Sequence, residues 1–180
     1  MYESSDFERI YKDAHLAKIK QGPEVMSILT EWITDPKHIL FYFGNVGTGK
    51  TYLCAAWYQS LREERKNVRA YTEQSFFRDL KITIQNGWDP GKRIRDICDA
   101  DYCILDDMGS STMTEWQKEM LFDFINQRNY SNLPTLITSN MTKEFIEKEF
   151  TQRFNSRLMA KKHTFLHLNG PDRRCLDNFE

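Results

Sequence analysis

The sequence predicts an α/β fold of three layers, in which helices flank a mostly parallel central sheet. The first observation behind this prediction is the alternation of short apolar segments with stretches of helical periodicity. The second is the octet GNVGTGKT at 44–51, which follows the apolar run 39–43 and opens a helical stretch, as the loop of a strand–loop–helix unit does. In such folds the ligand site forms at the carboxyl ends of the strands. Residues that follow each predicted strand are therefore the candidates for a site.

The individual elements follow from the same patterns. Residues 7–34 have apolar positions at helical spacing, interrupted at Gly22-Pro23, and predict two helices before the first strand. The apolar runs predict strands at 38–43, 68–72, 102–106, 134–139 and 163–168. The stretches between them predict helices at 50–65, 73–86, 91–99, 114–129 and 142–160, with a turn at Asn86-Gly87. We expect residues 1–36 to form an N-terminal helical extension and residues 37–180 to form the core.

Composition narrows the class of protein. With 180 residues, 40% of them hydrophobic, the chain suits one globular domain. No apolar run approaches the ~20 residues that span a bilayer, and Met1 begins a polar segment, so we expect a cytoplasmic protein without membrane contact. The net charge of -1 excludes a strongly basic surface, so any nucleic-acid contact must come from a local patch. The cysteines form no C-x-x-C pair and are predicted to be reduced and mostly buried: Cys54, Cys98, Cys103 and Cys175.

The octet has the pattern of a phosphate-binding loop. Glycines at 44, 47 and 49 carry no side chains, so backbone N–H groups can turn toward an anionic phosphate at the positive end of the following helix. Lys50 is expected to reach the terminal phosphates, and the Thr51 hydroxyl to join the shell of a Mg²⁺ ion. An ordinary Gly-rich turn is the alternative, which the flanking strand and helix disfavour. The predicted nucleotide-binding residues are Gly44, Asn45, Val46, Gly47, Thr48, Gly49, Lys50, Thr51 and Tyr52.

A pair of carboxylates follows the strand predicted at 102–106. We expect Asp106 to hold the Mg²⁺ ion through its water shell, and Asp107 to orient or deprotonate an attacking water. Paired acids after a strand also occur as a solvated turn, but the phosphate loop in the same chain favours the catalytic interpretation.

Asn140 follows the next predicted strand, at the same edge of the sheet. Its neutral amide can hydrogen-bond a γ-phosphate and a lytic water without changing the local charge. The alternative is a helix N-cap, for which either Asn140 or Thr142 would serve. The two roles are compatible, because different groups would fill them.

Arg153 and Arg157 lie four residues apart and therefore on one face of a helix. A guanidinium at a domain edge can enter a neighbour's site and stabilise transition-state charge, which would make hydrolysis depend on assembly. The alternative is a pair of surface arginines that form ion pairs with Glu147 or Glu149.

Together the segments GNVGTGKT, ILDDMGS, LPTLITSN and RFNSRLM, in this order, resemble AAA+ ATPases of the DnaC-type helicase loaders and the IstB-type transposition helpers. The resemblance covers roughly residues 37 to 174. It implies a P-loop NTPase with an AAA+ core that binds ATP and Mg²⁺ and has no C-terminal lid domain. It also implies Asn140 as the first sensor, Arg153 as a finger acting in trans and Arg157 as its companion.

Proteins of this kind carry an extra helical element that faces single-stranded DNA, here from about Gln74 to Ala100. Aromatic and basic side chains together can stack on bases and neutralise phosphates. Buried packing of Phe76 and Phe77 in an ordinary helix fits the pattern equally well. The candidates for DNA contact are Phe76, Phe77, Arg78, Lys81, Trp88, Lys92, Arg93 and Arg95.

The leading functional expectation is a helicase-loader-like ATPase that self-associates on binding ATP, assembles on single-stranded DNA and contacts a replicative helicase. An IstB-like transposition helper is the close alternative. A P-loop small-molecule kinase would need an arginine-rich lid, and the sequence between Asp107 and Asn140 contains no such segment. A scaffold that binds ATP and scarcely hydrolyses it is also considered, because Asp107 stands where many relatives have the longer Glu.

Overall fold

A parallel sheet of five strands forms the middle layer of the computed structural model, which describes residues 11–168. The strand order is β2-β3-β4-β1-β5. This arrangement confirms the predicted α/β class, and each strand lies close to its predicted position. The strands are β1 (Ile39–Gly44), β2 (Val68–Thr72), β3 (Tyr102–Met108), β4 (Thr135–Ser139) and β5 (Thr164–Leu168).

Strand β1 lies between β4 and β5 and is apolar on both of its faces. Ile39 and Phe41 belong to the hydrophobic cluster on one side of the sheet, and Leu40 and Tyr42 belong to the cluster on the other. A strand buried on both faces reads as a continuous apolar run. This explains why the sequence before the octet shows no alternation.

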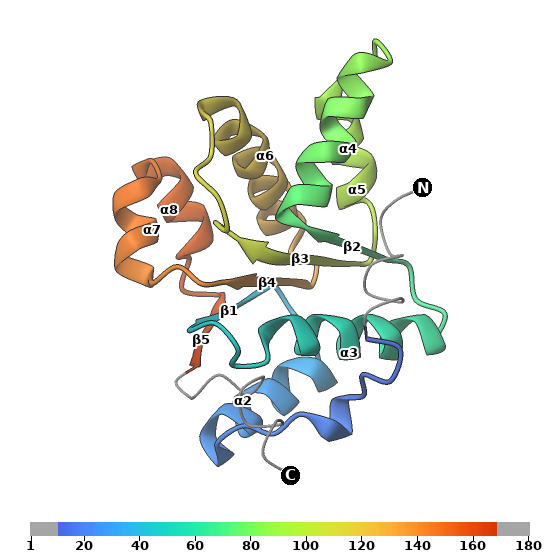
Figure 1. The fold of residues 1–180 in the computed structure, drawn as a ribbon, viewed down its shortest axis with the longest axis vertical. Coiled ribbons are helices and arrows are strands. Elements are labelled where there is room, and N and C mark those ends of the chain that lie inside the picture. Colours follow the sequence, from blue (N-terminus) through green and yellow to red (C-terminus); the bar gives the residue numbers. More distant parts are fainter. Residues whose placement is uncertain (1–10, 169–180) are drawn as a thin grey trace.

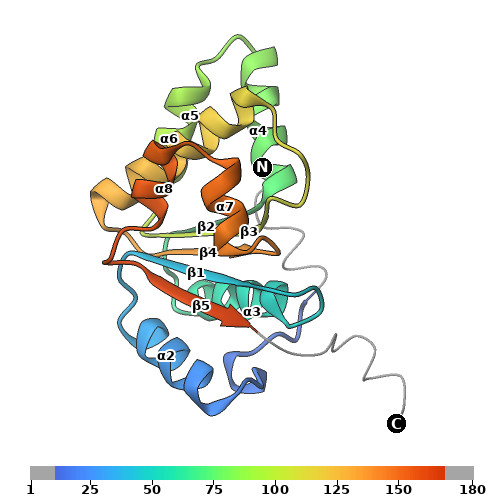
Figure 2. The same cartoon turned by 90° about the vertical axis from the view of Figure 1, so that its left-hand side faces the viewer.

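Helices cover both faces of the sheet (Figure 1, Figure 2). On one face lie α2 (Pro23–Thr34) and α3 (Lys50–Glu63). On the other face lie α4 (Glu73–Gln85), α5 (Pro90–Cys98), α6 (Glu115–Ser131), α7 (Lys143–Glu149) and α8 (Gln152–Leu158). The α4–α5 hairpin projects beyond the rest of this layer (Figure 1). Within residues 11–168 no helix combines the length and apolar content that a membrane span needs.

The predicted first helix is wrong for the part of it that the structure describes. Residues 11–21 contain only a 3-10 turn, η1 (Leu16–Lys18), whereas Phe7 and Ile10 lie outside the described residues. The Gln59 side chain donates to the Tyr11 carbonyl, and the Gln21 side chain donates to the Thr48 carbonyl at 2.9 Å. Contacts with distant parts of the chain therefore hold this segment, and they override its local helical periodicity.

The helix predicted at 142–160 is two helices, because the chain breaks at Phe150. This residue is extended (φ -107°, ψ 158°), and the Thr151 hydroxyl caps α8 by accepting from the Phe154 N–H. The break lets the buried rings of Phe150 and Phe154 stack, with their centroids 4.1 Å apart. Thr142 caps α7 in the same way, through the Phe145 N–H, so it fills the N-cap role considered for Asn140 or Thr142.

His163 joins β1 to the end of α8. Its Nδ1 accepts from the Ile39 N–H at 3.2 Å, and its Nε2 lies 3.1 Å from the Arg157 carbonyl oxygen. A neutral ring protonated on Nε2 satisfies both contacts. Burial lowers the pKa of His163 from 6.5 to about 4, and the nearby Lys162 adds to this effect.

We expect His163 to make the protein sensitive to acid. The pKa of His163 is lower in the folded protein than in the unfolded protein. The stabilising contribution of its neutral form is therefore complete above pH 6.5 and is lost as pH falls toward about 4. The loss corresponds to at most about 3 kcal/mol of unfolding free energy. Urea titrations from pH 7.5 to 4.5 on wild type and His163→Gln would measure it, since glutamine can keep both contacts without titrating. His167→Gln, at an exposed position of β5, is the control. If the unfolding free energy of His163→Gln falls with decreasing pH as steeply as that of wild type, His163 is not the cause of the acid sensitivity.

Candidate nucleotide-binding site

The loop between β1 and α3 has a backbone that only glycine adopts easily. Gly47 and Gly49 have φ values of 78° and 96°. At Gly44 a Cβ would lie 2.2 Å from the Leu168 carbonyl oxygen, so a side chain there would displace β5. Two separate requirements, left-handed conformation and close strand approach, therefore explain the glycine spacing.

Lys50 lies inside this loop at the start of α3. Its Nζ donates to the Gly44 carbonyl at 2.8 Å and to the Asn45 carbonyl at 2.6 Å, and the residue is only 7% exposed. The Thr48 hydroxyl also donates to the Asn45 carbonyl, at 2.8 Å. The loop thus curls around the ammonium group, with the N-terminus of α3 beside it.

A β-bulge places the two predicted carboxylates side by side. On β3, Leu105 pairs with Ile137 and Met108 pairs with Ser139, so that Asp106 and Asp107 together oppose the single residue Thr138. Asp107 takes the extra position with φ 60°. The extra residue shifts the alternation of β3 by one position, so Leu105 and Met108, which are three residues apart, both belong to the same hydrophobic cluster.

Thr138 is a site residue that the sequence reasoning missed. Its hydroxyl donates to Asp106 Oδ1 at 2.5 Å and accepts from the Asp107 N–H at 3.0 Å. One side chain of β4 therefore orients both acids. A threonine inside a β-rich run such as TLITS carries no sequence signal of this role.

Asp106 is almost completely buried, at 2% exposure. Burial raises the pKa of its carboxyl, and hydrogen bonds from Thr138, Thr51 and Cys54 oppose that rise. Thr51 and Asp106 are therefore neighbours, as the sequence predicted for a shared metal site. A hydroxyl and a carboxylate are hard oxygen donors and fit Mg²⁺, which keeps several waters and binds phosphates through its remaining positions.

Asn140 and Asp107 also come together. The Asn140 side-chain amide donates to Asp107 Oδ1 at 2.8 Å. Strands β3 and β4 are neighbours in a parallel sheet, so their carboxyl ends bring these side chains to one edge. The two candidates for orienting a water molecule thus touch each other.

These side chains surround a cavity of about 460 Å³ at the end of the sheet. Part of the lining comes from the segment before α2, which the sequence reasoning did not assign to the site. Tyr11 packs edge-on against Tyr52, with ring centroids 6.1 Å apart, and the Gln21 side chain holds the Thr48 carbonyl. The lining residues are Tyr11, Lys18, Ile19, Gln21, Val46, Gly47, Gly49, Lys50, Thr51, Tyr52, Asp107, Thr138 and Asn140.

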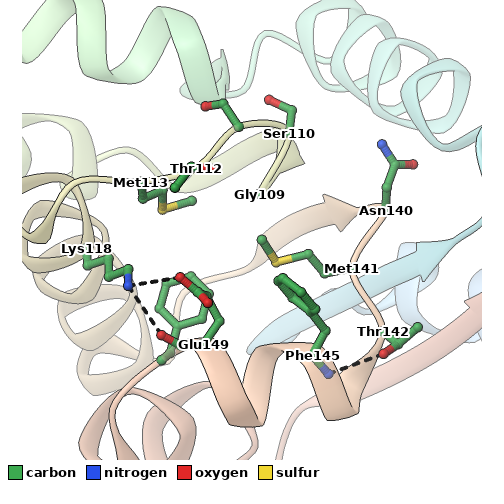
Figure 3. Close-up of a pocket in the computed structure, with 12 residues that line it drawn as sticks. Gly109, Ser110, Thr112, Met113, Lys118, Asn140, Met141, Thr142, Phe145 and Glu149 are labelled. Atoms are coloured by element: carbon green, nitrogen blue, oxygen red, sulfur yellow. Dashed lines mark hydrogen bonds and ion pairs between the residues drawn. The ribbon is translucent and has the colours of Figure 1, made fainter.

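The two candidate arginines do not line this cavity. Both are exposed on α8. The Arg153 guanidinium lies 4.6 Å from the centre of the Phe122 ring, and Arg157 Nε donates to Asn126 Oδ1 at 2.9 Å. Glu149 pairs with Lys118 at 3.0 Å instead, beside a second cavity (Figure 3).

The structure divides the candidate DNA-contacting residues into two groups. Phe76 and Phe77 are 1% and 3% exposed and belong to the core, so the buried alternative holds for them. Arg93 is half-buried and pairs with Asp79 at 2.8 Å. The exposed members are Arg78, Lys81, Trp88, Lys92 and Arg95.

Comparisons with known proteins identify the family of this chain. A family model described as IstB-like ATP binding protein matches residues 6–164. The replicative helicase loader DnaI of Bacillus subtilis (strain 168) is 27% identical over 113 residues, which are 62% of this chain and 36% of that protein. The replicative helicase loader DnaC of Escherichia coli (strain K12) is 26% identical over 118 residues, 65% of this chain and 48% of that protein. The chain thus spans less than half the length of either loader.

Solved structures share the fold. A crystal structure of the DnaC helicase loader has a TM-score of 0.76 at 18% identity and covers 89% of this chain and 99% of that one. The replication initiator DnaA bound to AMPPCP and single-stranded DNA has a TM-score of 0.76 at 16% identity, covering 92% of this chain and 55% of that one. These comparisons confirm the resemblance to AAA+ proteins. Because the family match extends over residues 6–164, the chain belongs to the IstB-like ATP-binding family and has the P-loop fold that this family shares with the helicase loaders.

Proposed function

We propose that this protein is an ATP-hydrolysing accessory protein of DNA replication, of the helicase-loader type, which assembles on single-stranded DNA. The observation that carries the proposal is the meeting of the phosphate loop, Asp107 and Asn140 around one cavity at the carboxyl edge of the sheet. Asp106 lies directly behind this lining, hydrogen-bonded to Thr138. Parallel sheets bind ligands at this edge. Both acids needed for metal-assisted hydrolysis lie next to a loop shaped for phosphate.

Each side chain has a distinct role in this proposal. Lys50 would exchange its carbonyl partners for phosphate oxygens, and Thr51 and Asp106 would hold Mg²⁺. The metal, when bound, neutralises charge on the phosphates. Asp107 orients or deprotonates water, and Asn140 positions it from the other side. Tyr11, Ile19 and Tyr52 provide apolar surface for the base.

The α4–α5 hairpin supplies the proposed DNA contact. It projects from the domain and exposes Arg78, Lys81, Lys92 and, at 70% exposure, Trp88. Cations of this kind neutralise phosphates, and an exposed indole can stack on a base without reading sequence. Single-stranded DNA and a replicative helicase are the partners we propose, with self-association on ATP binding. The structure of DnaA with AMPPCP and single-stranded DNA supports the DNA part by analogy.

A transposition helper is the second candidate, and the IstB-like family match specifically favours it. The same ATPase core would then serve duplex DNA and a transposase. Affinity capture with the tagged full chain separates the two candidates. Recovery of a ring helicase supports the loader, whereas recovery of a transposase supports the helper.

The direct test is molar mass in solution, measured by light scattering with a nonhydrolysable ATP analogue and a single-stranded oligonucleotide. We expect the mass to rise from that of the 21.4 kDa chain to a multiple of it when both are present. Lys50→Ala, which lacks the phosphate-binding ammonium, should remain at the lower mass. Calorimetry that detects no adenine nucleotide binding to wild type, or turnover that releases no phosphate, would contradict the proposal.

A further inference from the structure

Glu73 is a buried acid at the first position of α4, outside every role described above. It is 1% exposed. Its carboxylate accepts from the Gly109 N–H and, at 3.2 Å, from the Ser111 hydroxyl. Both donors lie in the loop that follows β3, two and four residues after the catalytic candidate Asp107. Burying a carboxylate costs free energy unless hydrogen-bond donors surround it, and here the loop after β3 provides those donors.

Helix capping does not account for Glu73. The preceding residue Thr72 already caps α4 in a capping box with Ser75. An acid in the first turn favours a helix from an exposed position as well, as at Glu115 of α6. The Glu73 side chain is instead buried and accepts hydrogen bonds from the loop after β3.

Thr138 and Asn140 contact Asp107 itself, and further contacts hold the residues that follow it. The Met108 carbonyl accepts from the Ser139 hydroxyl at 2.6 Å, and the Ser110 N–H donates to the Asp107 carbonyl at 3.2 Å. Gly109, at φ 79°, faces Met141 so closely that a Cβ would lie 2.0 Å from the Met141 Cε (Figure 3). The Gly109 N–H has Glu73 as its partner, and Asp107 stands two residues before it in a left-handed conformation.

We propose that Glu73 is a positioning residue that holds the Gly109–Ser111 loop and thereby fixes Asp107 for hydrolysis. This inference rests on the proposed ATPase function. Without the carboxylate the Gly109 N–H loses its acceptor, and the turn closed by Ser110 and Asp107 loses its outer support. Asp107 would then leave its place beside Asn140 while the phosphate loop, on the other side of the site, stays unchanged.

Burial and charge are consistent with this role. Burial raises the pKa of Glu73, the Gly109 and Ser111 hydrogen bonds lower it, and the nearby Asp107 raises it. The carboxylate also lies at a cavity of about 290 Å³ whose lining includes Arg78 and Lys81 of α4. Glu73 thus connects the base of the exposed hairpin to the loop beside the catalytic acid.

The first readout uses nucleotide-free protein. Labelling glycine with ¹⁵N leaves 8 glycine signals in the chain, so the Gly109 amide can be followed alone. Glu73→Met, of similar size but without an acceptor, should speed hydrogen exchange at Gly109 by about tenfold or more, because the amide opens locally. Gly47 and Gly49 of the phosphate loop should be unchanged. Glu73→Gln, which keeps a neutral acceptor, should fall between wild type and Glu73→Met.

The second readout is turnover. We expect kcat for ATP to fall about 10- to 100-fold in Glu73→Met, as a displaced catalytic group predicts, with nucleotide Kd within about threefold of wild type. Ser111→Ala should show a smaller loss in the same direction. Gln74→Met, at the exposed neighbouring position, is the matched control and should match wild type.

Several results would overturn the inference. An unchanged rate of hydrogen exchange at Gly109 in Glu73→Met would show that Glu73 does not hold the loop. Faster exchange with unchanged kcat would show that holding the loop does not affect hydrolysis. Parallel losses of kcat, nucleotide affinity and melting temperature would show a structural role only. Normal turnover in wild type and Glu73→Met would overturn the role of Glu73 alone, whereas a wild type without turnover would overturn the proposed function itself.

Discussion

The Arg153→Ala protein should bind ATP as wild type does and hydrolyse it about 10³-fold more slowly, because a guanidinium that enters from a neighbouring subunit stabilises the transferring phosphoryl group. The structure is compatible with action between subunits. Arg153 is exposed on α8, rests against Phe122, and does not line the cavity of its own chain. The measurement is steady-state phosphate release at protein concentrations where the nucleotide-bound form assembles, with binding measured separately by calorimetry.

A mixing experiment makes this prediction sharper. Lys50→Ala lacks a working nucleotide site but keeps its arginine, whereas Arg153→Ala keeps the site and lacks the arginine. If the arginine acts between subunits, a mixture of the two inactive proteins should recover part of the wild-type rate. Arg62→Ala, at an exposed position of α3 on the opposite face of the sheet, should be fully active. Wild-type turnover in Arg153→Ala would remove this residue from the mechanism.

Replacing Arg128 with methionine should lower the unfolding free energy by about 4 kcal/mol, because several buried acceptors lose their donor at once. Arg128 is 0% exposed on α6. Its five N–H donors are all used. They reach the carbonyl oxygens of Cys98, Ala100, Asp101 and Pro134 and the Thr135 hydroxyl. This one guanidinium therefore joins the end of α5 to the beginnings of β3 and β4.

For a domain of this size the loss corresponds to a decrease of about 10 °C in melting temperature. Urea unfolding at neutral pH and differential scanning calorimetry would measure it. Arg128→Lys should also be destabilised, because an ammonium has fewer donors and cannot reach the same five acceptors. Arg95→Met is the control, since that arginine is 59% exposed and pairs with Asp89 at 3.4 Å. A melting temperature of Arg128→Met equal to that of the control would contradict the role of Arg128.

Local sequence patterns were sufficient to predict the strands and the phosphate loop. The apolar run of β1 and the glycines of 44–51 have physical requirements that neighbouring residues reveal, namely burial on both faces and positive φ. The meeting of Thr51 with Asp106 and of Asp107 with Asn140 was predictable because parallel strands end at one edge. The catalytic roles of these residues stay predictions until turnover is measured.

The features that the sequence analysis predicted wrongly or missed depend on tertiary packing. The break at Phe150 interrupts a run with helical periodicity because stacking on Phe154 stabilises it. The Asp106–Asp107 bulge, the carboxylate of Glu73 and the wall formed by Tyr11 depend on partners more than 30 residues away in the chain.

The sequence by itself determined the α/β class, the phosphate loop and the family, because these depend on periodicity and on residue types at fixed spacing. Only the tertiary structure decided which side chains orient the acids, which arginine holds the core together and which phenylalanines are buried. Those outcomes depend on which unpaired donors, acceptors and apolar surfaces meet when distant segments pack.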